Sequence, residues 1–343
     1  MKQSTDPQIL TIVLNYRTAE MTLQAVEAAL LEMEGLAGAI TVVDNDSGDG
    51  SYEAIARAVL ARGWSRVRVL QSGHNGGYGA GNNFGMCHGL PDGSAPDYIY
   101  ILNSDAFPES GAIRALVEHL EAHPEVGIAG SRVHGAGGEY HQTAFRFPTV
   151  FSEFENGAST GPISWLLRRY VVAMPEPQEA LTVDWLVGAS LMVRHNVFEE
   201  LGGFDERFFL YYEETDLCLR AQRAGWTAVY LPQSRVMHIE SVSTGMKTLS
   251  RMPAYWFDSR LWYFSKNHGV LYAAMATLAL LTGTLVSRVR RLLGQRRPGR
   301  HKLALRDLVS HALRCAWYRR LLHQAHQRDT PFTPQPSDFG SLQ

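Results

Sequence analysis

Three acidic side chains stand within the four-residue segment 213–216. An apolar, aromatic run precedes the segment at 208–212, and apolar residues at helical spacing follow it up to Gly225, a typical helix stop. Crowded carboxylates repel one another, so such a cluster is typical either of a solvated helix start or of a site that needs a base beside a cation. A helix N-terminus stabilises each acid by only about 0.3–1 kcal/mol, and the cluster alone leaves both interpretations open.

Apolar runs typical of buried strands dominate the first 130 residues. The runs lie at 9–14, 40–43, 67–70, 98–102 and 126–129. Residues at helical spacing separate the first two runs, with Leu23, Val26 and Leu30 as the clearest example. This alternation predicts an α/β protein with a Rossmann-like, mostly parallel sheet flanked by helices. Ligands of such sheets bind beyond the carboxyl ends of the strands.

The carboxyl ends of the first four expected strands carry polar or glycine-rich segments. These segments are Asn15-Tyr16, Asp44 to Gly50, His74 to Asn83, and Asn103 to Asp105. Together they predict one shared crevice, because parallel strands end at the same edge of a sheet. An acid in the place of Asp105 can bind a hard cation that also contacts phosphate, or it can form an Asx turn. Asp44 could accept hydrogen bonds from a nucleobase or a ribose. Segment 73–85 lacks the Lys-Ser/Thr pair of a P-loop, but its backbone could approach a nucleotide closely.

The pattern changes after residue 130. Residues 131–181 lose the alternation and predict irregular surface structure. A strand-like run resumes at 183–193, with small residues at 188–190 that would let another group approach the backbone closely. His238 follows a further strand-like run and an expected turn around Pro232. Its imidazole could bind a metal or a phosphate, or it could be a buried histidine satisfied by the backbone.

The composition is that of a globular protein with one large domain or two moderate ones. Hydrophobic residues make up 45% of the 343 residues and charged residues 19%. The net charge of −2 gives no argument for nucleic acid as a partner. The three cysteines are far apart, which suits a reducing compartment and offers no zinc spacing. The first residues lack the apolar core of a signal peptide, so we expect the catalytic part in the cytoplasm.

The C-terminal part combines an apolar stretch with a basic one. Residues 270–287 contain no charged side chain, and 288–302 contain seven basic residues and no acid. This pair predicts an interfacial anchor on an anionic membrane leaflet, where each basic residue adds about 1 kcal/mol. The alternative is a buried helix followed by a solvated basic linker. The tail after Thr330 is rich in Pro and polar residues, which predicts disorder.

Taken together, these segments resemble the family 2 glycosyltransferases, which have the GT-A fold, and within them the bacterial rhamnosyltransferase-like members. The matching segments, in the order of the family, are 12–16, 42–51, 75–83, 101–105 and 184–217. The resemblance spans about residues 9–268. It implies a GT-A domain at 1–268, with a nucleotide-binding half at 9–130 and an acceptor-binding half at 131–268. A helical, basic and membrane-associated extension would follow at 269–330, and a disordered tail at 331–343.

The resemblance also implies roles for the acidic residues and the histidine. Asp105 stands in the family's DxD-type motif and would bind Mg²⁺ or Mn²⁺, together with His238. Glu214 falls where the family has its general base, although Asp is commoner there. Glu213 would orient the acceptor or the base, and Asp216, the third catalytic candidate, would cap the helix.

Donor and acceptor contacts are implied in the same way. The residues expected to bind the nucleotide sugar are Asn15, Asp44, Asn75, Gly76, Asn82, Asn103 and Ser104. Asn103 occupies the first position of the DxD-type motif, where Asp is commoner. The residues expected to bind the acceptor are Asp184, Trp185 and Gly188.

The expected function is an inverting, metal-dependent sugar transfer without a covalent intermediate. The base removes the proton of the acceptor hydroxyl, a contribution of about 10²–10⁴-fold, and the metal neutralises charge on the departing diphosphate. The resemblance implies dTDP-L-rhamnose as donor, with UDP-sugars as the alternative. It implies a glycan or lipid-linked acceptor, in cell-surface polysaccharide synthesis at the inner face of the cytoplasmic membrane. A nucleotidyltransferase is disfavoured, because no Gly-rich loop with Arg or Lys stands near the N-terminus. An inactive sugar-nucleotide-binding protein is the remaining alternative.

Overall fold

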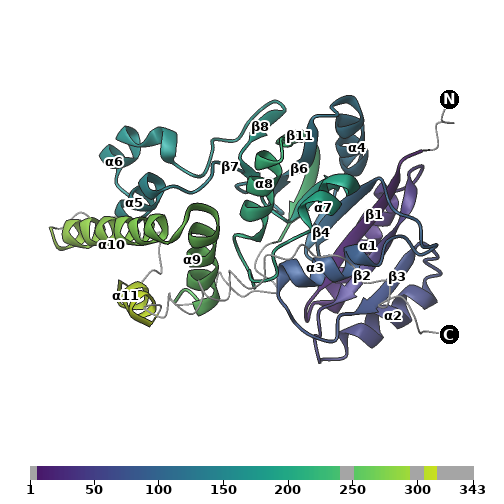
Figure 1. Ribbon diagram of the computed structural model, residues 1–343. Helices are drawn as coiled ribbons and strands as arrows, with labels where there is room; N and C mark the ends of the chain where they lie inside the picture. The colour runs from purple at the N-terminus through teal and green to yellow at the C-terminus, as the bar shows by residue number, and fades with distance from the viewer. Residues whose placement is uncertain (1–5, 240–250, 294–304, 315–343) are drawn as a thin grey trace.

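The computed structural model describes residues 6–239, 251–293 and 305–314. Its centre is a nine-stranded sheet with the strand order β3-β2-β1-β4-β10-β6-β11-β5, and β8 pairs with β11 (Figure 1). A separate two-stranded ribbon joins β7 and β9. The strands are β1 (Gln8–Asn15), β2 (Ala37–Asp44), β3 (Val67–Gln71), β4 (Tyr98–Asn103), β5 (Ala106–Pro108), β6 (Val126–His134), β7 (Ala144–Phe145), β8 (Leu181–Val183), β9 (Trp185–Leu186), β10 (Ser190–Arg194) and β11 (Thr227–His238).

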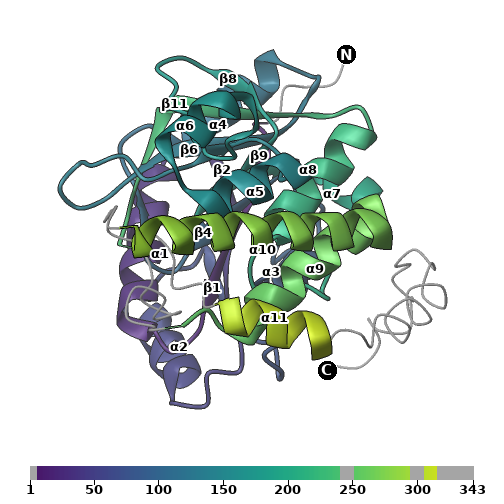
Figure 2. The same ribbon diagram turned by 90° about the vertical axis from the view of Figure 1, so that its left-hand side faces the viewer.

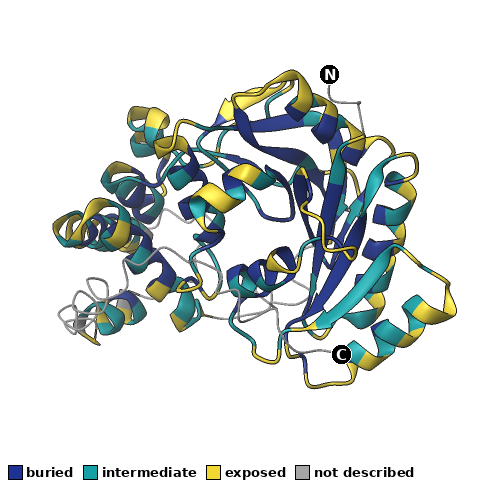
Figure 3. Cartoon of the chain, turned by 45° about the vertical axis from the view of Figure 1, so that its right-hand side comes forward, coloured by how far each residue is buried: buried dark blue, intermediate teal, exposed yellow. Residues whose placement is uncertain are grey.

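Helices cover both faces of the sheet, which makes three layers. The first core cluster packs α1, α2 and α4 against one face, and the second packs α3, α7 and α8 against the other. The central strands are buried between the layers, the edge strand β3 is only partly buried, and the outer faces of the helices are exposed (Figure 3). The α-helices are α1 (Ala19–Glu32), α2 (Ser51–Ala61), α3 (Tyr78–Cys87), α4 (Ala112–Ala122), α5 (Val150–Ala158), α6 (Gly161–Leu166), α7 (His195–Leu201), α8 (Glu213–Arg223), α9 (Ala254–His268), α10 (Val270–Leu292) and α11 (Leu305–Arg314).

The predicted parallel sheet flanked by helices is confirmed for β1 to β4. The register places Asn15 of β1 opposite Asp44 of β2 and Leu14 opposite Asn103 of β4. Continuous apolar runs with β-branched residues form these strands because both of their faces are buried. The polar residues that follow the runs therefore meet at one edge of the sheet.

Three expectations about the second half of the chain were wrong. The run 183–193 is not one strand: Val183 ends β8, residues 185–186 form β9 of the ribbon, and residues 190–193 belong to β10, which lies antiparallel between β4 and β6. Pro232 does not make a turn: β11 continues to His238, with a register shift between Leu231 and Arg235. Proline lacks the N–H needed for the ladder, so a bulge accommodates it. The stretch 131–181 also contains two α-helices; Thr149 begins α5 with a capping box.

The predicted helical C-terminal extension is confirmed by α10 and α11. In α10, the segment Val270–Arg290 is long and apolar enough to cross a membrane by length and composition, and 28% of its most apolar window is buried. Figure 2 looks onto α10, which crosses the front of the molecule with α5 beside it. The basic residues from 294 to 302 and the tail 331–343 lie outside the described residues.

Close contact between two glycines joins α10 to α5. A Cβ atom on Gly283 would stand 2.4 Å from the Phe154 carbonyl oxygen, and one on Gly157 would stand 2.6 Å from the Leu280 carbonyl oxygen. Because both obstacles are backbone atoms, no side-chain rotation could relieve the clash. The absence of side chains at these positions therefore sets the distance between the helices.

We predict that Gly283→Val destabilises the protein. The added side chain must push α10 away from α5, and overpacking of this kind costs about 1–3 kcal/mol. Thermal unfolding followed by circular dichroism should show a lower midpoint. Ala274→Val is the matched control, because residue 274 lies on an exposed position of the same helix. Equal midpoints for the two variants would contradict the proposed packing.

Candidate active site

Two predicted nucleotide-sugar residues, Asn15 and Asp44, form a buried hydrogen-bond network at the ends of β1 and β2. The Asn15 amide nitrogen donates to Asp44 Oδ1 at 2.7 Å and to Ser47 Oγ at 3.2 Å. Ser47 also donates to Asp44, from its hydroxyl at 2.6 Å and its backbone N–H at 3.1 Å. The Asn15 amide oxygen accepts from Thr22. The network fixes the two loops that follow β1 and β2, and direct contact of Asp44 with a nucleotide stays a prediction.

The loop before α3 approaches this network through amide side chains. Asn45 donates to Asn75 Oδ1 at 3.0 Å and to the Gly77 carbonyl oxygen at 3.1 Å. A Cβ atom on Gly76 would stand 2.7 Å from the Ala80 Cβ atom. Asn82 is fully buried; its amide nitrogen donates to the Tyr78 carbonyl, whereas its Oδ1 atom has no hydrogen-bond partner.

The structure brings Asp105 and His238 together across 133 residues of chain. His238 Nε2 lies 2.9 Å from Asp105 Oδ1, and Asn103 Nδ2 lies 3.4 Å from the same nitrogen. The contact follows from the pairing of β5 with β11, which places His238 opposite Ala106. Ser104, between Asn103 and Asp105, accepts a hydrogen bond from the Thr18 hydroxyl at 3.1 Å.

Asp105 and His238 fit a divalent cation that takes further ligands from elsewhere. Within the described part of the chain, no group of three or more His, Cys, Asp or Glu side chains could hold a metal. Mg²⁺ is usually bound by one or two carboxylates, with water and substrate phosphates as its other ligands. The exposed fractions of Asp105 and His238 are 5% and 9%, so a cation there would be largely shielded from water.

Glu213 and Glu214 begin α8 directly after a strained turn. Tyr211 and Tyr212 both have positive φ angles, 72° and 71°, a conformation that costs bulky residues of order 1–3 kcal/mol each. Tyr212 is the N-cap of α8 and makes no side-chain cap. Glu213 is fully buried, and its Oε2 atom has no hydrogen-bond partner. Glu214 is partly exposed, so of the two it is the acid that can reach a substrate.

The backbone of Gly188 orients Glu214. Its N–H donates to Glu214 Oε1 at 3.1 Å, and its carbonyl accepts from the Tyr78 hydroxyl at 2.7 Å. A Cβ atom at position 188 would stand 2.4 Å from Glu214 Oε1 and 2.6 Å from the Tyr78 oxygen. Next along the chain, the Ala189 carbonyl accepts from the Asn103 N–H. Residues 188–189 therefore connect Glu214 with the end of β4.

Tyr78 is a site residue that the sequence did not reveal. Burial raises its pKa well above 10, and the negative charges of Glu214, Glu213 and Asp105 act in the same direction. Tyr78 thus lies within the field of both the α8 acids and the predicted metal ligand. Its partner Gly188 is 110 residues away, and no local pattern signals such a contact.

Burial raises the pKa values of both neighbouring glutamates. Burial raises the pKa of Glu214 to about 7, although backbone hydrogen bonds, including the one from Gly188, oppose the shift. Burial and then the charge of Glu214 raise the pKa of Glu213 well above its ordinary 4.5. At neutral pH Glu214 is therefore close to the midpoint of its titration. A general base works best with a pKa near the working pH.

Asp216 does not belong to this group. Its side chain is fully buried and accepts hydrogen bonds from Arg220 at 2.7 Å, Lys266 at 2.8 Å and Asn267 at 2.9 Å. It does not cap α8 either, since Tyr212 occupies the N-cap. The carboxylate joins α8 to α9, so the expectation of a catalytic or capping residue has no support in this geometry.

Asp184 and Trp185 are engaged in the β7–β9 ribbon. Asp184 Oδ2 accepts from the Phe147 N–H at 2.7 Å, and the Trp185 indole donates to the Arg146 carbonyl at 3.0 Å. The Trp185 ring stacks on Phe145 with centroids 4.0 Å apart. Both side chains remain partly exposed, and their contact with an acceptor stays a prediction.

The chain matches the model of the family described as glycosyltransferase like family 2 over residues 7–253. It is 30% identical over 240 residues to the N-acetylglucosaminyl-diphospho-decaprenol L-rhamnosyltransferase of Mycobacterium tuberculosis, covering 67% of this chain and 76% of that protein. It is 26% identical to a rhamnosyltransferase of Escherichia coli, covering 47% of this chain and 60% of the relative.

Solved structures share the fold at low sequence identity. A mannosyltransferase from Pyrobaculum calidifontis, in complex with GDP-mannose and Mn²⁺, aligns with a TM-score of 0.55 at 14% identity and covers 92% of this chain and 82% of that chain. A GalNAc transferase solved with UDP, GalNAc and Mn²⁺ aligns with a TM-score of 0.52 at 12% identity, over 69% of this chain and 44% of that one. Sequence and fold agree: the chain belongs to glycosyltransferase family 2 and has the GT-A fold.

Proposed function

We propose that this glycosyltransferase moves L-rhamnose from dTDP-rhamnose, with inversion, to a hydroxyl group of a lipid-linked glycan in cell-surface polysaccharide synthesis. The observation that carries the mechanism is the partly exposed Glu214 carboxylate, held by the Gly188 N–H and with its pKa raised to about 7. The choice of donor and acceptor is supported by the name of the mycobacterial relative, which acts on a diphospho-decaprenol glycan.

In this mechanism the protein performs one proton transfer. Glu214 accepts the proton of the acceptor hydroxyl as the new glycosidic bond forms, and the bond from the sugar to the diphosphate breaks on the opposite face. Glu213, fully buried beside it, would orient the base. Asp105 and His238 would hold Mg²⁺ or Mn²⁺, which neutralises the charge of the leaving diphosphate. Asn15, Asp44, Asn75, Gly76, Asn82, Asn103 and Ser104 are the proposed donor contacts.

We also propose that α10 places the enzyme at the inner face of the cytoplasmic membrane. Its exposed apolar side chains recur at heptad-like spacing along one stripe and are Leu271, Met275, Leu278, Leu285, Val289 and Leu292. The basic residue Arg288 is exposed near the end of the stripe, and Arg168 and Arg169 are exposed after α6, which itself exposes Trp165. An apolar stripe bordered by arginines is complementary to an anionic leaflet.

We predict that Glu214→Gln lowers kcat for donor turnover by about 10²–10⁴-fold, because the general base is lost. Glu213→Gln should retain at least about tenfold more activity than Glu214→Gln, because Glu213 is fully buried and is not the proposed proton acceptor. Wild-type turnover should rise with pH up to about 7 and fall about tenfold per pH unit below it, since only ionised Glu214 accepts a proton. Wild-type rates in Glu214→Gln would exclude this base.

The donor and the metal can be tested with a panel of dTDP-, UDP- and GDP-sugars in the presence of Mn²⁺ or Mg²⁺. Release of the nucleoside diphosphate measures turnover. We expect turnover of dTDP-rhamnose that disappears with a chelator and returns with added metal. Asp105→Asn should require much more metal for the same rate, because the cation loses a charged ligand. Turnover of a UDP-sugar alone would replace the proposed donor, and no turnover of any sugar nucleotide would favour an inactive binding protein.

Vesicle cosedimentation tests the proposed membrane face. The full chain should bind vesicles of phosphatidylcholine with phosphatidylglycerol more strongly than vesicles of phosphatidylcholine alone. Replacing Leu271, Leu278 and Leu285 together by Ser should weaken binding by about tenfold or more, since each leucine loses apolar burial in the lipid. Leu60→Ser, at an exposed site on α2, is the control and should bind as the wild type does. Equal binding of the triple variant would place the membrane contact elsewhere.

A further inference from the structure

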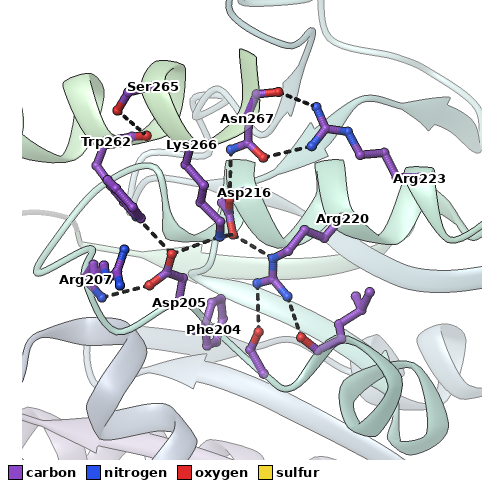
Figure 4. Close-up of polar contacts among 12 residues, drawn as sticks. Phe204, Asp205, Arg207, Asp216, Arg220, Arg223, Trp262, Ser265, Lys266 and Asn267 are labelled. Atoms are coloured by element: carbon purple, nitrogen blue, oxygen red, sulfur yellow. Dashed lines mark hydrogen bonds and ion pairs between the residues drawn. The ribbon is translucent and has the colours of Figure 1, made fainter. Parts of the chain in front are cut away.

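Helix α9 begins at Ala254, directly after residue 253, where the match to the family model ends. One side of α9 nevertheless packs against residues 205–216, the segment that leads into the catalytic helix α8. Figure 4 shows the polar part of this contact, with Trp262, Lys266 and Asn267 on α9. The family match therefore does not include a helix that lies next to the proposed base.

Aromatic side chains of α9 hold the strained turn before Glu213. The Phe209 and Tyr255 ring centroids are 5.6 Å apart, and Tyr212 lies 5.4 Å from Tyr263 and 6.3 Å from Trp256. The backbone is held as well, since Ser259 Oγ donates to the Leu210 carbonyl at 3.0 Å. The turn contains two tyrosines with positive φ angles, a conformation that persists only where surrounding contacts hold it. Helix α9 supplies such contacts to the side chains and to the backbone.

Lys266 joins the two ends of the same segment. Its ammonium lies 2.8 Å from Asp216 Oδ2 and 2.9 Å from Asp205 Oδ2, and the Trp262 indole also donates to Asp205 at 2.9 Å (Figure 4). Arg220, on the other side of Asp216, donates to the Leu201 and Gly203 carbonyls at 2.8 Å. One cation thus fixes residue 205 and residue 216 with respect to α9.

A neighbouring face of α9 is anchored to α5 and α10. Arg260 is 2% exposed and forms an ion pair with Glu153 of α5 at 2.6 Å, and it also donates to Thr277 of α10 at 3.2 Å. The α5–α10 pair is itself held together by the contact between Gly157 and Gly283. Helix α9 therefore lies between a fixed support and the turn that carries the base.

We propose that α9 is a positioning element for catalysis: Lys266 and Ser259 hold the Tyr211–Tyr212 turn so that Glu214 stays at the Gly188 N–H. This inference rests on the proposed role of Glu214 as the base. Lys266 touches no substrate in this scheme and acts only through the segment 205–216. Loss of the contact displaces the carboxylate, and a displacement of about 1 Å can cost about 10²-fold in rate.

The test compares Lys266→Ala, Lys266→Arg and Ser259→Ala with Arg223→Ala in the full chain. Arg223 joins the same two helices, by bonds to Asn267, but lies at the far end of α8 and is exposed. One readout is backbone hydrogen–deuterium exchange of residues 209–216, which needs no ligand. The other is kcat, KM and the pH midpoint for dTDP-rhamnose with Mn²⁺.

We expect Lys266→Ala to speed exchange at 209–216 and to lower kcat by about 10–100-fold at unchanged donor KM, with a shifted pH midpoint. Ser259→Ala should show the same changes to a smaller extent, Lys266→Arg should restore most of the rate, and Arg223→Ala should resemble the wild type. Wild-type exchange and kcat in Lys266→Ala would overturn the inference. Wild-type kcat in Glu214→Gln would instead remove the proposed base, and the exchange data would still show whether α9 holds the turn.

Discussion

The hydrogen bond from the Gly188 N–H to Glu214 Oε1 is the contact on which the arrangement of the site depends. It joins the first turn of α8 to the chain segment that enters β10, and through Ala189 it reaches the end of β4 beside Asp105. Burial raises the pKa of Glu214 to about 7, and hydrogen bonds from the backbone of Glu214 and of Gly188 oppose this shift. Without it, a carboxyl group so placed would hold its proton more firmly and would be a poorer base at neutral pH.

Two kinds of support keep this contact in place. The sheet provides the first, because the parallel pairing of β1, β2 and β4 brings Asn15, Asp44 and Asn103 to one edge. Helix α9 provides the second, by packing on the turn before α8. The strands of the first support lie within residues 8–103, whereas α9 is formed by residues 254–268. Assembly of the site therefore requires contacts between residues more than 100 positions apart, such as Asp105 with His238.

The residues that the sequence predicted well are those whose position depends on local pattern. Apolar runs gave the strands β1 to β4, and the register of neighbouring strands then placed Asn15 and Asp44 together. Tyr78 could not be found in this way, because its role depends on Gly188, which lies in another part of the fold. Asp216 was misjudged for the same reason: its partners Lys266 and Asn267 follow 50 and 51 residues later. The close contact of Gly283 with α5 could not be found from local pattern either, because it depends on Phe154 and Gly157 more than 120 positions earlier.

The contacts of Gly188 have a consequence for redesign of this enzyme. Acceptor pockets are commonly widened or narrowed by substituting residues beside the catalytic base. Here the residue beside Glu214, the proposed base, is Gly188. A Cβ atom at position 188 would stand 2.4 Å from Glu214 Oε1 and 2.6 Å from the Tyr78 oxygen, so these two side chains fill the space that a larger residue would need. Variant libraries made to change the acceptor would therefore keep Gly188 unchanged. They would vary the partly exposed residues Asp184 and Trp185, which are the proposed acceptor contacts.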